Sequence, residues 1–232
     1  MDTQKTRPDS RTALLHAARD LIFTRSFEHV GTAEICARAG VRKGSLYHFF
    51  SSKEDLVLAM LDELMDDFER AVLVRSLEGH GSLREQIDAF VQAIHAFEAA
   101  VYREAGHLPG CPFGNLIVET GTYSPGLRQA MKGHLDRVAG HFQRCLQKGI
   151  NRGELPAQAD THALAERWLA LMEGILVMAK VDQDPATILR LGPALHVLIG
   201  VSGPHTGSDD SLSGPVGSGA EPGVSPTTRR SS

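Results

Sequence analysis

The sequence has few cysteines, a single tryptophan and no long apolar run. Three cysteines in 232 residues are too few for a disulfide framework and are typical of a reducing compartment. The first residues, 1–5, lack the apolar core of a signal peptide. The most apolar stretch, residues 168–179, is interrupted by Glu173 and is too short to cross a bilayer. We therefore expect a cytoplasmic protein with no membrane partner.

No charge of one sign dominates. The net charge is −4, so no overall basic excess indicates nucleic acid. Residues 1–60 carry two more basic than acidic side chains, whereas residues 61–200 carry five more acidic than basic ones. This separates a basic head from an acidic body, although random variation in surface charge explains so small a difference equally well.

Strand alternation is lacking as well, and apolar residues recur with the helical period over most of the chain. Ser51 or Ser52 can cap a helix that starts at Lys53, and Ser51 with Glu54 has capping-box spacing, as Ser82 has with Glu85. Beyond the head, the predicted long helices span about 53–77, 82–101, 127–149, 160–181 and 185–200, the last kinked or broken at 192–193. The sequence therefore predicts an all-α chain.

The composition divides the chain into three parts. We expect a head over residues 1–52, ordered from about residue 9, and a body of long helices over residues 53–200. The tail, residues 201–232, holds 18 Ser, Gly and Pro residues, and such a segment cannot bury enough apolar surface to offset its ordering entropy. It is predicted to be disordered. Arg229 and Arg230 then form a solvated end, or contact DNA or a partner.

The segment from Thr32 to Phe50 carries the main signal. Thr32 is expected to cap a short helix, Gly40 to end it in the left-handed conformation, and residues 43–50 to form a second short helix. Cys36 supplies the small side chain needed where two such helices cross. The apolar residues expected to hold the pair together are Ile35, Val41, Leu46 and Phe49.

The side chains left exposed on the second helix are mostly cations and hydrogen-bonding groups. They are Arg42, Lys43, Gly44, Ser45, Tyr47 and His48. Cations and hydroxyls reach phosphates and base edges, and glycine permits a close backbone approach. This set predicts a recognition helix of a helix-turn-helix, which would lie in the major groove of DNA.

The head resembles the tetracycline-repressor (TetR/AcrR) family of bacterial transcriptional regulators. The resemblance covers about 47 residues and depends on the first helix, 11–27, and on Thr32, Ile35, Ala39-Gly40-Val41, the run 43–50 and the run 52–56. Cys36 departs from the family, which usually has alanine there, and we interpret it as an inert buried thiol. The alternative is a helical turn that is packed for structure alone.

The resemblance implies roles in DNA recognition. Thr32, Ser45, Tyr47, His48 and Lys53 would contact phosphates, although His48 also fits a plain surface position. Arg42 and Lys43 would read bases, with guanine O6 and N7 as acceptors. Two heads on one dimer would read a palindromic operator.

The body is expected to supply the dimer interface and an effector pocket. The helices at 160–181 and 185–200 are apolar nearly all round, so they pair with their copies in a homodimer or are buried within one subunit. The predicted pocket residues, each of which also fits a plain core, are Phe90, Ile94, Phe97, Leu116, Tyr123, Met131, Trp168 and Met172. Glu119 is either a polar handle in that pocket or a surface carboxylate.

Cys111 is a candidate switch. The run Gly110-Cys111-Pro112 resembles the Gly-Cys segment of one TetR branch, which includes sensors of electrophiles and hypochlorite. Pro112 suits the first helical position, so Cys111 would be the N-cap, where the helix dipole lowers the pKa of a thiol, and His107 could help. The rival interpretation is a small side chain that fills space beneath a turn.

Other classes of function have less support. His134, His141 and Cys145 share a helical face, but no short-spaced ligand pair accompanies them, so we expect no metal and no cofactor. The sequence has no Gly-rich phosphate loop, nucleophile elbow or His-Glu-x-x-His motif, so an enzyme is not expected. The prediction is a repressor that a small apolar ligand, or modification of Cys111, releases from DNA. The alternative is a helical interaction protein that does not bind DNA.

Overall fold

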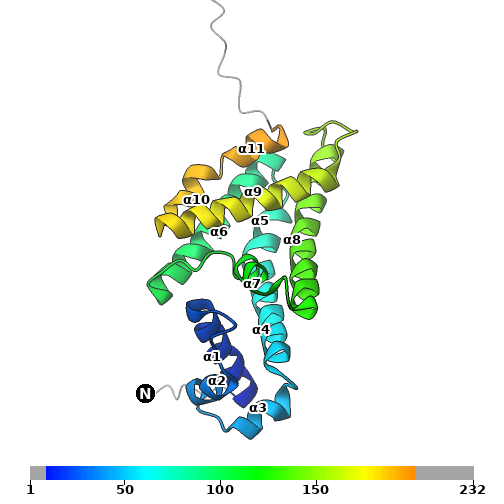
Figure 1. Cartoon of the computed structure of the whole chain (residues 1–232). Coiled ribbons are helices and arrows are strands. Elements are labelled where there is room, and N and C mark those ends of the chain that lie inside the picture. The colour runs from blue at the N-terminus through cyan, green and yellow to red at the C-terminus, as the bar shows by residue number, and fades with distance from the viewer. Residues whose placement is uncertain (1–8, 202–232) are drawn as a thin grey trace, which may run out of the picture. The chain divides into compact units, whose positions relative to one another are not determined.

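The computed structural model describes residues 9–201, and every regular element in that range is a helix (Figure 1). The bounds are α1 Ser10–Arg25, α2 Thr32–Ala39, α3 Lys43–Phe49, α4 Lys53–Phe68, η1 Glu69–Val74, α5 Arg75–Leu77, α6 Leu83–Ala105, α7 Pro112–Thr120, α8 Pro125–Asn151, α9 Thr161–Asp182, α10 Ala186–Leu191 and α11 Ala194–Ile199. The all-α prediction is confirmed. The predicted disordered tail, with Arg229 and Arg230, lies outside the described residues except for Val201.

The head is a small three-helix unit in which α1 packs on α2, α3 and also on α4. Asp9 caps α1 by accepting a hydrogen bond from the Thr12 N–H, and Gly40, with a φ of 68°, ends α2 in the left-handed region as predicted. Thr32 is not the cap of α2. The N-cap is Gly31, and Thr32 is the first residue of the helix.

The packing of the head corrects one predicted core residue. Ile35, Cys36 and Leu46 are buried as expected. Phe49, however, is 41% exposed, and its neighbour Phe50 is buried in its place. Since α3 ends at Phe49, Phe50 has extended backbone, and the change of conformation turns the second ring inward. The small Cys36 thiol lies in the core, as an inert buried thiol would.

The helix predicted over 53–77 is continuous but not uniform. Ser52 caps α4 by accepting from the Asp55 N–H, and the Asp55 carboxylate accepts from the Ser51 N–H. The capping box predicted from the spacing of Ser51 and Glu54 is therefore wrong: Ser52 is the cap, and Asp55 takes the place of Glu54. After Phe68 the chain forms a π-helical segment, η1, before it returns to an α-helix.

The body consists of long helices around an apolar core (Figure 1). The predicted caps are confirmed: Ser82 and Glu85 form a capping box on α6, and Asp160 caps α9. The single helix predicted over 185–200 is two helices, α10 and α11. Gly192 lies close to Val91 of α6, and Pro193 interrupts the hydrogen bonding that would join the two helices.

Ionic contacts join η1 to α8. Arg137 binds the carboxylates of Asp66 and Glu69, and the His141 Nε2 lies 2.5 Å from the Glu69 Oε1. The His141 hydrogen bond and the Arg137 guanidinium hold the pKa of Glu69 below its usual range. The helix that leaves the head is thus attached to the body by charged pairs as well as by its apolar face.

Candidate functional site

The predicted recognition face is open on α3. Arg42, Lys43, Gly44, Tyr47 and His48 are exposed. Ser45 is half-buried, and Tyr47 is 51% exposed despite its aromatic ring. Within residues 9–201, none of the side chains of Arg42, Lys43, Ser45, Tyr47 and His48 takes part in an intramolecular hydrogen bond or ion pair. A Cβ placed on Gly44 would meet no atom within 4 Å, so the backbone there is free for a close approach.

Two other basic side chains of the head are paired with carboxylates of the head. Arg38 binds Asp20 at 2.9 Å, and Arg25 binds Glu34. Arg42 and Lys43 have no such partner among the described residues. Arg42 and Lys43 are therefore two neighbouring unpaired cations where α3 begins, and an anion approaching this face meets cations that need not break an ion pair first.

Lys53, for which a phosphate contact is predicted, is engaged within the head. Its Nζ donates to the carbonyl oxygens of Phe27 at 2.7 Å and Val30 at 3.1 Å, and it lies 4.0 Å from the centre of the Phe27 ring. Two of its three N–H donors are thus engaged inside the head. Lys53 holds the start of α4 against the loop between α1 and α2. Its presence in the family motif is therefore explained by a structural role as well as by a contact with DNA.

A second connection joins the body to the same loop. The Glu119 carboxylate of α7 accepts hydrogen bonds from the Phe27 N–H at 3.0 Å and the Glu28 N–H at 2.9 Å. Tyr123, which follows α7, donates to the Glu28 carboxylate, and burial together with this bond raises the pKa of Tyr123 to about 12. Glu119 thus neither contributes a polar group to the predicted pocket nor lies free at the surface. Tyr123 contacts the same loop and does not line the cavity.

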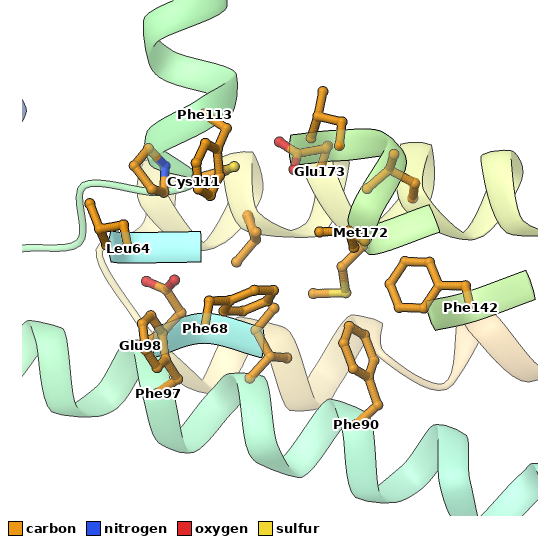
Figure 2. A pocket seen from close by; sticks show the side chains of 16 residues that line it. Leu64, Phe68, Phe90, Phe97, Glu98, Cys111, Phe113, Phe142, Met172 and Glu173 are labelled. Carbon is orange, nitrogen blue, oxygen red and sulfur yellow. The ribbon is translucent and has the colours of Figure 1, made fainter. Parts of the chain in front are cut away.

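The body encloses a mostly apolar cavity (Figure 2). It contains about 590 Å³ of space between atoms, part of it open to solvent, and about 50 Å³ can hold the centre of a water molecule. The residues that line it are Leu64, Phe68, Phe90, Ile94, Phe97, Glu98, Cys111, Pro112, Phe113, Leu135, Val138, Phe142, Leu169, Met172, Glu173 and Leu176. The side chains nearly fill the cavity, so it suits a compact ligand or must widen for a larger one.

The prediction of this cavity was correct for about half of its residues. Phe90, Ile94, Phe97, Cys111 and Met172 line it. The other four predicted residues do not: Leu116, Met131 and Trp168 are buried elsewhere, and Tyr123 is 50% exposed.

Trp168 lies one layer behind the cavity wall. Its ring stacks on Phe142 with centroids 4.4 Å apart, and it meets Phe90 edge to face. Since both phenylalanines line the cavity, the single tryptophan of the chain is positioned to sense what enters it.

Two carboxylates in the cavity were missed by the sequence reasoning. Glu98 of α6 and Glu173 of α9 enter it from opposite sides (Figure 2). The signal that could have found Glu98 is its register, since it follows Ile87, Val91 and Ile94 at core spacing. In the sequence, Glu173 only interrupts the apolar stretch 168–179. A carboxylate at a core position is the kind of exception that marks a site.

The N-cap position predicted for Cys111 is confirmed, but the expected lowering of its pKa is wrong. Cys111 caps α7, Pro112 is the first helical residue, and the Gly114 N–H donates to the Cys111 Sγ at 3.3 Å. Burial, and the Glu173 carboxylate to which the thiol donates, nevertheless raise the pKa of Cys111 well above its usual value. The thiol is thus protonated at neutral pH.

The other predicted partners of a thiol or a metal do not converge. A ring nitrogen of His107 bonds to the Ala105 carbonyl at 3.1 Å and is engaged there. The three side chains on one face of α8 have separate partners instead: His134 lies near Asp62, His141 near Glu69, and Cys145 near Gln86. Over the described range 9–201, no group of three or more His, Cys, Asp or Glu side chains could hold a metal ion. In the same range, no helix is both long and apolar enough to traverse a bilayer.

Two family models match the chain. The one described as bacterial regulatory proteins of the tetR family matches residues 14–60, and the one described as the tetracyclin repressor-like C-terminal domain matches residues 84–195. The first match contains the recognition face on α3. The second contains both carboxylates of the cavity and Cys111. The matches therefore correspond to the two regions described above.

Relatives and solved structures extend over both regions. The chain is 30% identical to the transcriptional regulator AcuR of Cereibacter sphaeroides, covering 77% of this chain and 81% of that protein. It is 28% identical to the HTH-type transcriptional repressor NemR of Escherichia coli, covering 77% and 88%. The crystal structure of E. coli NemR in its reduced form superposes with a TM-score of 0.70 at 25% identity, covering 84% of this chain and 100% of that one. A regulatory protein TetR from Rhodobacter sphaeroides also gives 0.70, at 26% identity, covering 82% and 98%.

Proposed function

Because the chain belongs to the tetR family of bacterial regulatory proteins, we propose that it is a repressor that leaves its operator when the cavity is filled or Cys111 is modified. It is a DNA-binding transcriptional regulator, as AcuR and NemR are. Members of this family bind operator DNA and dimerise. The proposed site of action is the cytoplasm, where a bacterial operator is found.

The observation that carries the proposal is the free positive charge of α3. Arg42 and Lys43 lie at the exposed start of this helix without an intramolecular partner among the described residues, while Arg25 and Arg38 are paired. We assign base reading to Arg42 and Lys43, and phosphate contact to Thr32, Ser45, Tyr47 and His48. Lys53 is assigned a positioning role in place of a phosphate contact.

The proposed homodimer uses α9 and α11. Val177, Met178 and Val181 of α9 are exposed by 56%, 46% and 70%, and they share a face with Ala170 and Gly174. Val197 of α11 is 84% exposed. An apolar stripe of this kind is costly in water and is covered when a second copy packs against it. Two heads on one dimer then meet the two half-sites of a palindrome.

The route proposed for release runs along α7. At the start of α7, Cys111 forms part of the cavity wall. Near its end, the Glu119 carboxylate accepts hydrogen bonds from the N–H groups of Phe27 and Glu28, in the loop between α1 and α2. Leu64 and Phe68 of α4 also line the cavity. A ligand that displaces either helix changes the position of the head, so it favours one of two dimer shapes. The two shapes would differ in the spacing of the recognition helices.

Two kinds of release remain to be separated. The raised pKa of Cys111 favours a non-covalent ligand, because a protonated thiol reacts slowly with electrophiles. The second kind of release is covalent modification of Cys111. The position of Cys111 in the cavity wall favours it, because an adduct on the thiol would occupy the space that a non-covalent ligand would take.

Fluorescence anisotropy with labelled DNA from upstream of the protein's own gene tests the proposal. We expect binding that weakens with salt and is reduced at least tenfold in Arg42→Ala and Lys43→Ala, with Arg38→Ala as the control that removes a paired cation of the same head. Treatment with N-ethylmaleimide, in wild type and Cys111→Ser, separates the two kinds of release. Equal binding by the Arg42, Lys43 and Arg38 variants would move the DNA contact away from the start of α3. Absence of salt-dependent binding by the wild type would instead support a helical interaction protein that does not bind DNA.

A further inference from the structure

The cavity contains negative charge without a positive partner. Of the residues that line it, Glu98 and Glu173 are acidic, and none is a lysine, arginine or histidine. Glu98 is only 6% exposed, and within residues 9–201 its carboxylate has neither a hydrogen-bond donor nor an ion-pair partner. A buried carboxylate is normally paired or bound by hydrogen bonds, so the Glu98 carboxylate is available to pair with a positively charged group that enters the cavity.

The groups that face Glu98 do not remove this deficit. Leu64 and Phe68 of α4 are apolar, and the titratable groups that share the cavity are Glu173 of α9 and the Cys111 thiol of α7. Burial, together with the negative charge of Glu173, raises the pKa of Glu98 to about 7. Burial also raises the pKa of Glu173. Protonation therefore removes the charge of these carboxylates more readily than it does for an exposed carboxyl group.

The remaining wall is suited to a cation rather than to a polar neutral group. Five phenylalanine rings line the cavity: Phe68, Phe90, Phe97, Phe113 and Phe142. The faces of aromatic rings attract positive charge, most strongly where water is excluded. An anionic ligand would meet two carboxylates, and a neutral apolar ligand would leave Glu98 buried and unpaired.

We propose that the cavity takes a compact organic cation, an apolar or aromatic amine, with its positive charge between Glu98 and Glu173. The proposal rests on the effector-binding function proposed above and specifies the chemical class of the effector. Glu173 also lines a groove on the outer side between α8 and α9, together with Leu135 and Leu169. Glu173 is thus accessible from this groove as well as from the cavity.

Proton release is a signature of this form of binding. A positive charge between the two carboxylates stabilises their ionised forms, so binding expels the proton that Glu98 holds near neutral pH. For a ligand whose own charge does not titrate, affinity must rise between pH 6 and pH 8. A neutral ligand of the same shape would show no such rise.

The test uses two quaternary ammonium ions, tetramethylammonium and benzyltrimethylammonium, and neopentylbenzene as the neutral isostere of the second. Binding to the full chain without DNA is followed by the fluorescence of the single tryptophan, Trp168, which stacks on the cavity residue Phe142, and by calorimetry. We expect at least one cation to bind, and benzyltrimethylammonium to bind at least tenfold more tightly than neopentylbenzene. Glu98→Gln should lose at least tenfold in affinity for the cation and nothing for the isostere.

Glu104→Gln is the matched control, since it removes one carboxylate from the exposed surface of the same helix. It should bind the cation as wild type does. Failure of both cations to bind, equal binding of the neutral isostere, or an unchanged affinity in a folded Glu98→Gln variant would each overturn the proposal. Because no DNA is present, these outcomes are independent of the anisotropy experiment, which alone decides whether the chain is a DNA-binding repressor.

Discussion

The Glu119 carboxylate of α7 accepts a hydrogen bond from the backbone N–H of Phe27, 92 residues earlier in the chain. The neighbouring Glu28 N–H donates to the other carboxylate oxygen. The loop held in this way is the one whose carbonyl oxygens Lys53 binds from the start of α4. The position of the head is therefore set from both sides, by α4 and by the helix that begins at the cavity.

Removal of the Glu119 carboxylate should loosen this loop. Hydrogen bonds to a charged group contribute about 1.5–3 kcal/mol each, and partial exposure at this site reduces that, so we expect a local loss of about 2 kcal/mol in Glu119→Ala. The amide hydrogens of Phe27 and Glu28 should then exchange about thirtyfold faster. Glu104→Ala, which removes an exposed carboxylate from α6, should leave them unchanged. If exchange at these two amides were the same in both variants, α7 would not be what holds the loop.

Lys53 should behave as a residue of the fold rather than of the DNA interface. Lys53→Met removes two donors to backbone carbonyls and the contact with the Phe27 ring, so the free energy of unfolding should fall by about 2 kcal/mol. Lys43→Met should leave stability within about 0.5 kcal/mol and weaken DNA binding. Urea unfolding and the salt dependence of anisotropy separate the two. A stable Lys53→Met protein with a salt slope reduced by about one would restore the phosphate contact.

The dimer surface can be tested at a glycine. A Cβ added at Gly174 of α9 meets no atom within 4 Å, so Gly174→Arg fits the monomer but places a charge in the proposed interface. We expect sedimentation to show dimers for wild type and monomers for this variant, with unchanged helicity. Val118→Arg is the control, because Val118 is 86% exposed on α7, outside that face. Dimers that persist in Gly174→Arg would move the interface away from α9.

Local signals in the sequence were sufficient for most of the fold. Helix periods, the Ser82–Glu85 box, the Asp160 cap and the glycine at position 40 are determined by residues close in sequence, and the structure has them as predicted. Errors arose where a choice between neighbours depends on tertiary packing. Whether Phe49 or Phe50 turns inward is decided by where α3 ends against α1 and α4, which periodicity does not show.

The candidate sites divide in the same way. The exposed set on α3 was predictable because it lies on one short helix. The cavity joins α4, α6, α7, α8 and α9, so its lining depends on how far apart those helices pack. Trp168 was expected in the lining because it is large and apolar, yet it stacks behind Phe142. The pKa of Cys111 could not be predicted either, since it is raised by burial among several helices and by the Glu173 carboxylate of α9, 62 residues later.

Cys111 should be a slow nucleophile whose reactivity depends on Glu173. Burial and the Glu173 carboxylate raise the pKa of the thiol, so little thiolate is present at pH 7.5. We expect N-ethylmaleimide to modify Cys111 more slowly than it modifies the same cysteine in the urea-unfolded chain. Glu173→Gln removes the neighbouring negative charge and should accelerate the reaction severalfold. Mass spectrometry of the peptide that contains Cys111 gives the rates, and a faster reaction in the native wild type would restore the lowered pKa predicted from the N-cap position.

Glu98 should make the stability of the protein depend on pH in a defined direction. Its pKa is about 7 in the folded chain, against 4.5 for an unperturbed carboxyl. Between these two values the unfolded chain releases a proton that the folded chain retains, so the contribution of Glu98 to stability falls as pH rises from 4.5 to 7 and is constant above that. A shift of this size corresponds to about 3 kcal/mol.

Comparison with Glu98→Gln isolates this contribution, because the amide does not titrate and the other carboxylates are common to both proteins. We expect the two proteins to have similar free energies of unfolding near pH 4.5. The variant should become the more stable one through pH 6 and should exceed wild type by about 3 kcal/mol at pH 8. Urea unfolding at the three pH values measures the difference. A difference that stays constant with pH would mean that Glu98 ionises as easily in the folded chain as in the unfolded one, which is incompatible with a carboxylate buried near Glu173 in a cavity that no lysine, arginine or histidine lines.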